Sequence, residues 1–83
     1  MKVRVRYFAS VRELLGSGEP VEVDEGVDVA GLRRALAGRG GRHAEALAPQ
    51  RMLRAARNQV LCSDSTVLAD GDEVGFFPPV TGG

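Results

Sequence analysis

Polar and apolar residues alternate at the start of the chain, from Lys2 to Tyr7. Val3, Val5 and Tyr7 would share one face of an extended segment, and the residues between them are Lys or Arg. A period of two with β-branched residues is typical of a strand that is buried on one face. The pattern therefore predicts a half-buried strand over residues 2–8.

A period near 3.6 marks the main helix. Val29, Leu32 and Leu36 would lie along one stripe of a helix, and Asp28 precedes them as a good N-cap residue. The glycine-rich segment 38–41 predicts the end of this helix. The sequence thus predicts one amphipathic helix that covers a sheet.

Shorter elements are expected on both sides of this helix. Residues 9–15 are expected to form a short helical turn, in which Ser10 and Glu13 make a capping box. The breakers at residues 16–20 predict a loop. Further strands are expected at residues 21–23, 52–56, 60–62 and 73–77, a helical turn at 43–48, and tight turns at 57–59 and 69–72.

The length and the order of the elements define the fold class. The chain has 83 residues, of which 43% are hydrophobic, and this suits one domain with one core. Two strands, a helix and then further strands predict an α+β fold with a mixed sheet packed on one main helix. The domain is expected to span residues 1–77, and residues 78–83 are expected to form a flexible, extended C-terminal tail.

Charge and hydropathy restrict the classes of function. Eleven Lys and Arg balance eleven Asp and Glu, and this argues against a nucleic-acid-binding domain with its usual basic excess. No apolar stretch approaches the roughly 20 residues that span a bilayer, and the first residues lack the apolar part of a secretory signal. We therefore expect a cytoplasmic protein that binds neither nucleic acid nor membrane.

Side chains that could carry catalysis are scarce. The chain has one His, His43, and one Cys, Cys62, so we expect no metal site and no internal disulfide. Cys62 falls in an apolar strand and is expected to be a small buried hydrophobic residue. The arginines in and after the main helix are expected to form a solvated face: Arg33, Arg34, Arg39 and Arg42.

All four aromatic residues stand at the ends of the first and last expected strands: Tyr7, Phe8, Phe76 and Phe77. If these strands are parallel neighbours, both pairs gather at one edge of the sheet. Neighbours along a strand face opposite ways, so one member of each pair should point away from the core. Ordinary strand-end packing would explain these residues, whereas an exposed aromatic pair beside the tail would mark a surface for a partner.

Three glycines near the end of the chain, Gly75 and the pair Gly82 and Gly83, have different implications. Gly75 interrupts the last expected strand, where glycine weakens pairing or marks a close approach. The final pair, Gly82 and Gly83, carries no side chain and could enter a narrow channel after the stiff, extended Pro78-Pro79. Two terminal glycines alone are nevertheless a weak signal, because frayed glycine-containing ends are common.

The complete ending is more specific. Residues 76–83, Phe-Phe-Pro-Pro-Val-Thr-Gly-Gly, resemble the C-terminus of the small sulfur-carrier subunits of molybdopterin synthase. Residues 7–16, the pair Asn58-Gln59 and residues 68–74 also resemble that family, whose fold is the ubiquitin-like β-grasp. Arg57 departs from the family pattern, which often has a small or apolar residue there. The resemblance implies the β-grasp fold for this chain.

The resemblance also implies a function located in the C-terminal carboxylate. An ATP-dependent, ubiquitin-activating-like adenylyltransferase would adenylate Gly83, and a sulfurtransferase would supply the sulfur for a thiocarboxylate. The tail would then enter the active site of the large synthase subunit, in a heterotetramer, and pass its sulfur to cyclic pyranopterin monophosphate during molybdenum cofactor biosynthesis. ATP would be used by the activating partner, and no cofactor would be bound by this chain. The residues implied to thread into the partner are Pro78, Pro79, Val80, Thr81 and Gly82.

Partner contacts are expected close to this tail. Phe8, Phe76, Phe77 and Val80 are candidates for apolar contact with both partners, and Arg12 could pair with an acidic group of the activating enzyme. Core packing of Phe8 and a surface ion pair of Arg12 are equally compatible with the sequence.

Two other functions stay open. One is a related carrier with the same tail chemistry that delivers sulfur to the thiamine thiazole, to a tRNA base or to another acceptor. The other is a non-catalytic binding module whose tail is merely disordered. The Pro-Pro-Val-Thr segment before the glycines favours the carrier of molybdopterin synthase.

Overall fold

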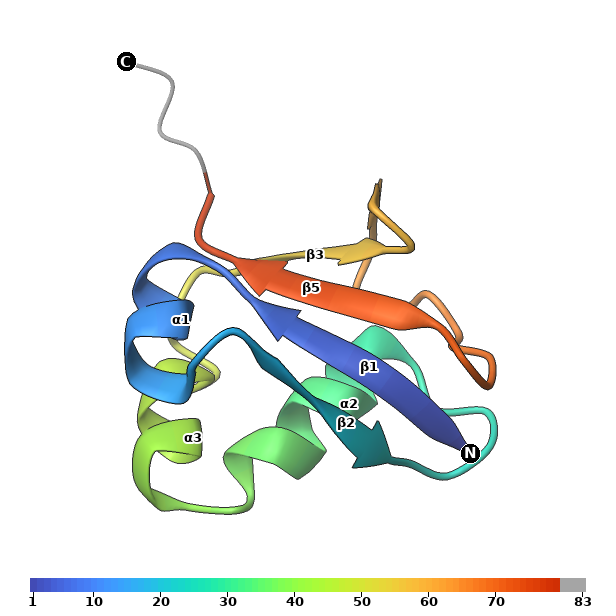
Figure 1. Ribbon diagram of the computed structural model, residues 1–83, viewed down its shortest axis with the longest axis horizontal. Helices are drawn as coiled ribbons and strands as arrows, with labels where there is room; N and C mark the ends of the chain where they lie inside the picture. Colours follow the sequence, from blue (N-terminus) through green and yellow to red (C-terminus); the bar gives the residue numbers. More distant parts are fainter. Residues whose placement is uncertain (80–83) are drawn as a thin grey trace.

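The computed structural model describes residues 1–79, which form a mixed sheet with helices on one side of it (Figure 1). Val80, Thr81, Gly82 and Gly83, to which the expected threading and carboxylate chemistry were assigned, lie outside the described residues. The division into a domain of residues 1–77 and a tail stays a prediction. The strands are β1 (Lys2–Tyr7), β2 (Gly18–Glu22), β3 (Arg54–Arg57), β4 (Val60–Cys62) and β5 (Glu73–Phe77), and the helices are α1 (Ala9–Leu15), α2 (Val29–Ala37) and α3 (Gly41–Ala46).

The first and last strands lie side by side in the middle of the sheet. The strand order is β2-β1-β5-β3-β4, in which β1 and β5 run parallel and the other neighbouring pairs run antiparallel. This confirms the expectation that the two aromatic pairs gather at one edge, since Tyr7 is the register partner of Phe76. The arrangement is the α+β fold predicted from the order of the elements, and it is the ubiquitin-like β-grasp that the family resemblance implies.

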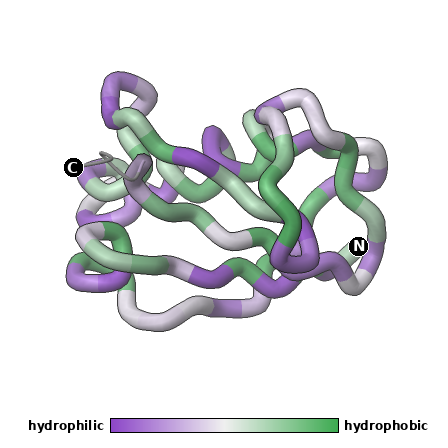
Figure 2. Tube along the Cα trace, turned by 90° about the horizontal axis from the view of Figure 1, so that it is seen from above, coloured by the Kyte–Doolittle hydropathy of each residue, from purple (hydrophilic) through white to green (hydrophobic). Residues whose placement is uncertain are grey.

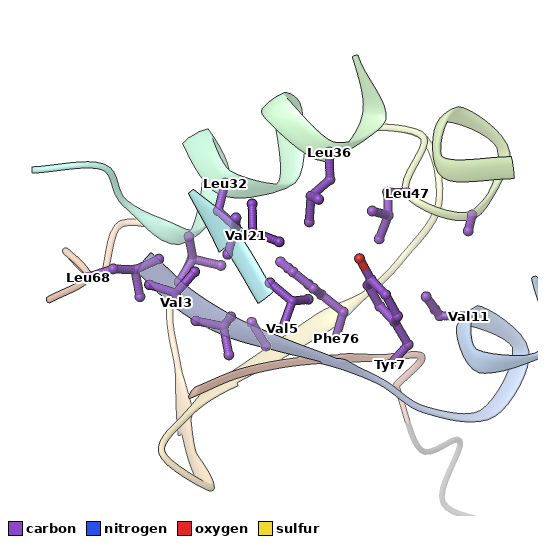
Figure 3. Packing of buried hydrophobic residues seen from close by; sticks show 14 residues of the cluster. Val3, Val5, Tyr7, Val11, Val21, Leu32, Leu36, Leu47, Leu68 and Phe76 are labelled. Carbon is purple, nitrogen blue, oxygen red and sulfur yellow. The ribbon is translucent and has the colours of Figure 1, made fainter. Parts of the chain in front are cut away.

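Strand alternation sends one set of side chains into a single core. Exposed and buried residues alternate along the whole of β1, and polar and apolar stretches follow one another along the trace in Figure 2. Figure 3 shows Leu32 and Leu36 of α2 pointing toward Val5 and Tyr7 of β1. These side chains belong to a core of buried hydrophobic residues, and burial of that core supplies the hydrophobic stabilisation that so small a domain obtains.

The main helix begins as the sequence predicts. The Asp28 side chain accepts a hydrogen bond from the backbone N–H of Gly31 at 2.8 Å, which satisfies one of the N–H groups that a helix leaves free at its start. Within residues 1–79, no helix combines the length and the apolar character needed to cross a membrane.

The second strand begins earlier than expected, because pairing with β1 outweighs the breakers. Gly18 pairs with Arg6 and Pro20 with Arg4, so part of the expected loop is strand. Proline is tolerated because β2 is an edge strand and needs no N–H on its open side. Gly18 is required, since a Cβ there would collide with the carbonyl oxygen of Val5.

Other element boundaries shift by two residues or so. Ser10 lies inside α1 and does not cap it: Phe8 is the N-cap residue, and no side chain forms a capping bond. The third strand is Arg54–Arg57 instead of residues 52–56, and the helical turn after α2 is Gly41–Ala46 instead of residues 43–48. For β3 the ends follow its pairing with β4 and β5, and shifts of one or two residues at helix ends are common because helix ends fray.

Arg33 does not belong to a solvated face. Its guanidinium donates hydrogen bonds to the carbonyl oxygens of Leu47 at 3.0 Å, Arg51 at 2.7 Å and Ala48. These carbonyls follow α3, where the backbone lacks helical partners. Arg33 therefore fixes the segment that connects α3 to β3.

A polar cluster ties the start of β2 to the helices. The Glu19 carboxylate accepts from the hydroxyl of Tyr7 at 2.9 Å and from Arg39 at 2.6 Å, and Nε2 of His43 lies 2.8 Å from it. Burial of Glu19 would raise its pKa, but the bonds from His43, Arg39 and Tyr7 outweigh burial and lower the pKa to about 2. Burial and the bond to Glu19 raise the pKa of Tyr7, so its hydroxyl remains a donor.

Candidate functional site

An apolar surface lies on the side of the sheet that the helices leave open. It consists of Phe8, Ala56, Leu61, Gly75 and Phe77, which we call the outer patch. Together with Gln59 and Glu73, these residues line a hollow of about 510 Å³. The outer patch adjoins the end of β5, where residues 78–79 leave the sheet (Figure 1).

The alternation of side chains at the end of β1 places Phe8 on this surface. Tyr7 points into the core with 1% exposure, and the next residue, Phe8, points outward with 40% exposure. The backbone N–H of Phe8 donates to the carbonyl of Phe76 at 3.1 Å, which holds the residue beside β5. The rings of Phe8 and Phe77 then meet edge to face, with centroids 6.5 Å apart, a favourable aromatic geometry.

Gly75 makes this position of Phe8 available. A Cβ at residue 75 would lie 2.9 Å from Cε2 of the Phe8 ring, closer than ordinary carbon contacts allow. The expectation of a close approach at Gly75 is therefore confirmed, and the approaching group is an aromatic ring rather than backbone.

Charged groups border the patch. The guanidinium carbon of Arg6 lies 5.7 Å from the centroid of the Phe8 ring, within the range of a cation–π interaction. The same guanidinium lies 3.8 Å from the carboxylate of Glu73. Arg6 is thus held over the ring from one side, while both charged groups remain accessible.

Hydrogen bonds around Asp72 fix the start of β5. Its carboxylate accepts from the N–H of Ala69 at 2.8 Å and from the Asn58 amide at 3.0 Å, and the Asn58 amide oxygen accepts from the N–H of Glu73 at 2.9 Å. The bond from Ala69, helped by Asn58 and the nearby Arg57, lowers the pKa of Asp72 against the effect of burial. Arg57, which departs from the family pattern, lies 3.8 Å from the Asp72 carboxylate and donates a hydrogen bond to the carbonyl of Val67 at 3.3 Å.

The structure brings together only part of the residues expected at the partner surface. Phe8 and Phe77 lie on the outer patch, and Pro78 and Pro79 follow it, half-buried. Phe76 is 1% exposed, so its side chain belongs to the core and is removed from the expected contact surface.

Arg12 does not line the hollow of the outer patch, although its backbone N–H donates to the carbonyl of Phe8 at 3.4 Å. It is exposed on α1, and within residues 1–79 it forms no salt bridge. The surface ion pair considered for it is therefore not present among the described residues, and pairing with a partner stays a prediction.

Sequence reasoning missed Leu61 and Arg6. Leu61 is 58% exposed on β4 and stands opposite Ala56 of β3. An unusually apolar three-residue segment, Val60–Cys62, was the available signal, but only the sheet register shows that its middle residue faces outward. The signal for Arg6 was its place two residues before Phe8, on the same side of an alternating strand.

These groups suit binding rather than catalysis. The side chains lining the hollow are apolar, aromatic, amide and carboxylate. The carboxylate of Glu73 is the one lining group of a kind that can act as a nucleophile, and it is paired with Arg6 at 3.8 Å. Cys62 is half-buried, and its thiol lies 3.7 Å from the carbonyl of Ala55, consistent with a packing role.

Several known proteins are similar to this chain in sequence and in fold. The model of the ThiS family matches residues 5–83. The chain belongs to the ThiS family. This ThiS-family chain is 46% identical over 81 residues to the molybdopterin synthase sulfur carrier subunit of Escherichia coli, with 98% of this chain and 99% of that protein covered.

Solved structures agree with the sequence relationship. A putative molybdopterin converting factor subunit 1 from Pyrococcus furiosus superposes on this ThiS-family chain with a TM-score of 0.80 and 33% identity, covering 96% of this chain and 99% of that one. A chain from the complex of subunits 1 and 2 of the molybdopterin-converting factor of Helicobacter pylori gives a TM-score of 0.68 and 30% identity over the full length of both.

Proposed function

We propose that this chain is the sulfur carrier of a molybdopterin synthase and that its C-terminal carboxylate, on Gly83, carries the sulfur. The observation that supports this most strongly is the continuity of the outer patch with the end of β5. A partner seated on the patch would receive the chain that follows Phe77. The similarity to a sulfur carrier subunit over almost the whole chain supports sulfur transfer as its chemistry.

The proposed chemistry needs no catalytic side chain from this protein. The carboxylate displaces pyrophosphate from ATP to form an acyl-adenylate on an activating enzyme. A sulfur nucleophile at the oxidation level of sulfide then displaces AMP and leaves a thiocarboxylate. Both steps require partners, because a free carboxylate is ionised at neutral pH and resists nucleophiles.

The proposed acceptor is a pterin precursor bound to the large synthase subunit. The complex formed by the Helicobacter pylori relative supports a large-subunit partner for this chain. In a complex of this chain with its large subunit, the outer patch would be covered. Burial of Phe8, Leu61 and Phe77 would then supply the apolar contact at the centre of the interface.

A mass experiment tests the proposal. The chain is incubated with ATP, a sulfide source and the activating enzyme of the same organism, and the intact mass is measured. We expect replacement of one oxygen by sulfur, and no replacement in a variant that lacks Gly83. An unchanged mass, with an activating enzyme that thiocarboxylates another carrier in parallel, would refute the carrier function.

The acceptor is tested separately. The thiocarboxylated chain is mixed with the large synthase subunit and cyclic pyranopterin monophosphate, and the dithiolene product is measured. A product excludes a carrier dedicated to thiazole or tRNA. Sulfur transfer to one of those acceptors without any dithiolene would assign the chain to that pathway instead.

A further inference from the structure

The open face of the sheet is more positive than the zero net charge of the chain suggests. Polar residues on this face follow from the strand alternation and register. The cations on these strands are Lys2, Arg4, Arg6 and Arg54, and the carboxylates are Glu22 and Glu73. This face therefore carries an excess of positive charge, which negative charge elsewhere on the molecule offsets.

Two of these cations have no carboxylate of their own. Lys2 pairs with Glu22 at 3.9 Å, and Arg6 pairs with Glu73 at 3.8 Å. Within residues 1–79, neither Arg4 nor Arg54 forms a salt bridge. Both side chains are exposed.

The two unpaired arginines stand on β1 and β3, the strands on either side of β5, which carries Phe77. Arg4 lies on β1, two residues before Arg6, and its register partners are the uncharged Pro20 on β2 and Glu73 on β5. The Glu73 carboxylate pairs with Arg6 instead of Arg4. Arg54 lies on β3 as the register partner of Phe77. A partner that covers Phe8 and Phe77 therefore lies beside Arg54, and it reaches Arg4 if its contact extends back along β1 past Arg6.

We propose that the outer patch selects a partner protein in which an apolar centre is bordered by carboxylates, and that Arg4 and Arg54 determine this specificity. The proposal rests on the proposed function, because it describes how the large synthase subunit recognises this chain. Guanidinium groups bind carboxylates in a planar, bidentate geometry. Complementary charges around an apolar contact accelerate association and exclude partners of the wrong charge.

Nucleic acid is a less suitable occupant of this face. Arginine and aromatic groups do bind nucleic acids, but here the hollow is lined by Leu61 and Phe77 and contains the carboxylate of Glu73, which would repel phosphate. A carboxylate inside the contact is compatible with a protein partner that offers a hydrogen-bond donor to it.

The experiment measures association rates with the large synthase subunit of the same organism by stopped-flow fluorescence. The test variant is Arg4→Glu with Arg54→Glu. The matched control is Arg34→Glu with Arg42→Glu, which changes the net charge equally but on exposed helical positions. A third protein, Arg4→Lys with Arg54→Lys, retains the charge. Thermal unfolding verifies that each variant is folded.

We expect the test variant to associate about tenfold or more slowly at low ionic strength, and the difference to shrink at high salt, where exposed charges are screened. The control should associate as the unaltered chain does, and the lysine variant should retain most of the rate. Equal rates for the test variant and the control would overturn the inference while the proposed function stands.

Two further outcomes distinguish the remaining explanations. If the unaltered chain does not bind the large subunit at all, the proposed function fails and this inference fails with it. If a single-stranded RNA oligonucleotide binds the unaltered chain and loses affinity for the test variant, with no change in large-subunit binding, the face recognises nucleic acid and the inference is wrong.

Discussion

Gly75 shows how one absent side chain can shape a binding surface. The Phe8 ring occupies the space that a Cβ at residue 75 would need, so the edge-to-face contact with Phe77 depends on a glycine two residues earlier in β5. In a strand interior glycine costs stability, because it loses more conformational freedom on folding than other residues. At residue 75 this loss of stability accompanies the space that lets the Phe8 ring pack beside Phe77.

A double-mutant cycle tests this dependence. We expect Gly75→Ala to destabilise the unaltered chain by about 1 kcal/mol, because the Phe8 ring must move. In a Phe8→Ala background the same substitution should stabilise the fold by about 0.5 kcal/mol, because only the glycine entropy remains. Urea unfolding of the four proteins measures both effects. The same sign in both backgrounds would contradict the assigned contact.

The turn between β3 and β4 contains a residue in an unfavourable conformation. Asn58 and Gln59 both have positive φ, at 50° and 69°, as in the two-residue turns that favour Asn-Gly. Asn58 suits the turn and also bonds to Asp72 and Glu73, whereas Gln59 has no such advantage in this region of φ and ψ.

Neighbouring substitutions in this turn should therefore act in opposite directions. Gln59→Gly is expected to stabilise the domain by about 0.5–1 kcal/mol. Asn58→Gly is expected to destabilise it by about 1–2 kcal/mol, because the N–H of Glu73 and the carboxylate of Asp72 lose a partner. Thermal unfolding of both variants provides the comparison, and a destabilising Gln59→Gly would refute the strain at this position.

At the scale of elements, sequence patterns predict long or regular elements better than short ones. β1 and α2 follow from residue periodicity, because one face of each is buried and a period of 2 or 3.6 records that face. The start of β2 does not follow, since pairing of Gly18 with Arg6 overrides a local breaker signal. The outer position of Leu61 also depends on sheet register, which a three-residue strand cannot specify by itself.

The candidate site divides in the same way. The side of the sheet on which Phe8 lies is predictable from alternation along β1. The close approach at Gly75 is predictable from the presence of a glycine inside a strand. The burial of Phe76 follows from the same alternation, once Phe77 is placed outward. The anchoring role of Arg33 could not be predicted, because its acceptors are carbonyls 14 to 18 residues later in the chain.

The hydrogen bonds to the Glu19 carboxylate, which join β2 to β1 and the helical region, should make the stability of the fold depend on pH. A carboxylate whose pKa falls from 4.5 to about 2 on folding stabilises the native state above pH 4.5, and this contribution is lost as the pH falls toward 2. Glu19→Gln should thus cost about 2–3 kcal/mol at pH 7, and the cost should become small near pH 2.

Urea unfolding of both proteins between pH 7 and pH 2 measures this difference. Glu45→Gln is the matched control, because Glu45 is an exposed carboxylate on α3 that forms no salt bridge within residues 1–79. A cost of Glu19→Gln that is equally large at both ends of the pH range would show that its hydrogen bonds, and not its charge, stabilise the fold.

At the scale of the molecule, the sheet separates stability from recognition. Its inner face packs on the helices and is almost completely buried, as Val5, Tyr7 and Phe76 show (Figure 3). Its outer face keeps Phe8 and Leu61 exposed. A chain of this size has one core only, so a surface for partners must come from residues that folding does not consume.

Phe76 and Phe77 allow this separation to be tested with two adjacent residues of the same type. Phe76→Ala is expected to cost about 3–5 kcal/mol of stability, because it leaves a cavity in the core, and this would unfold much of so small a domain. Phe77→Ala is expected to cost about 1 kcal/mol or less, yet to weaken binding to the large synthase subunit at least tenfold, because the ring lies at the centre of the proposed contact. Urea unfolding and titration of the large subunit measure the two quantities. A Phe77→Ala protein that binds normally would show that the outer patch is not the contact surface, whereas a loss of stability equal to that of Phe76→Ala would show that the two faces are not independent.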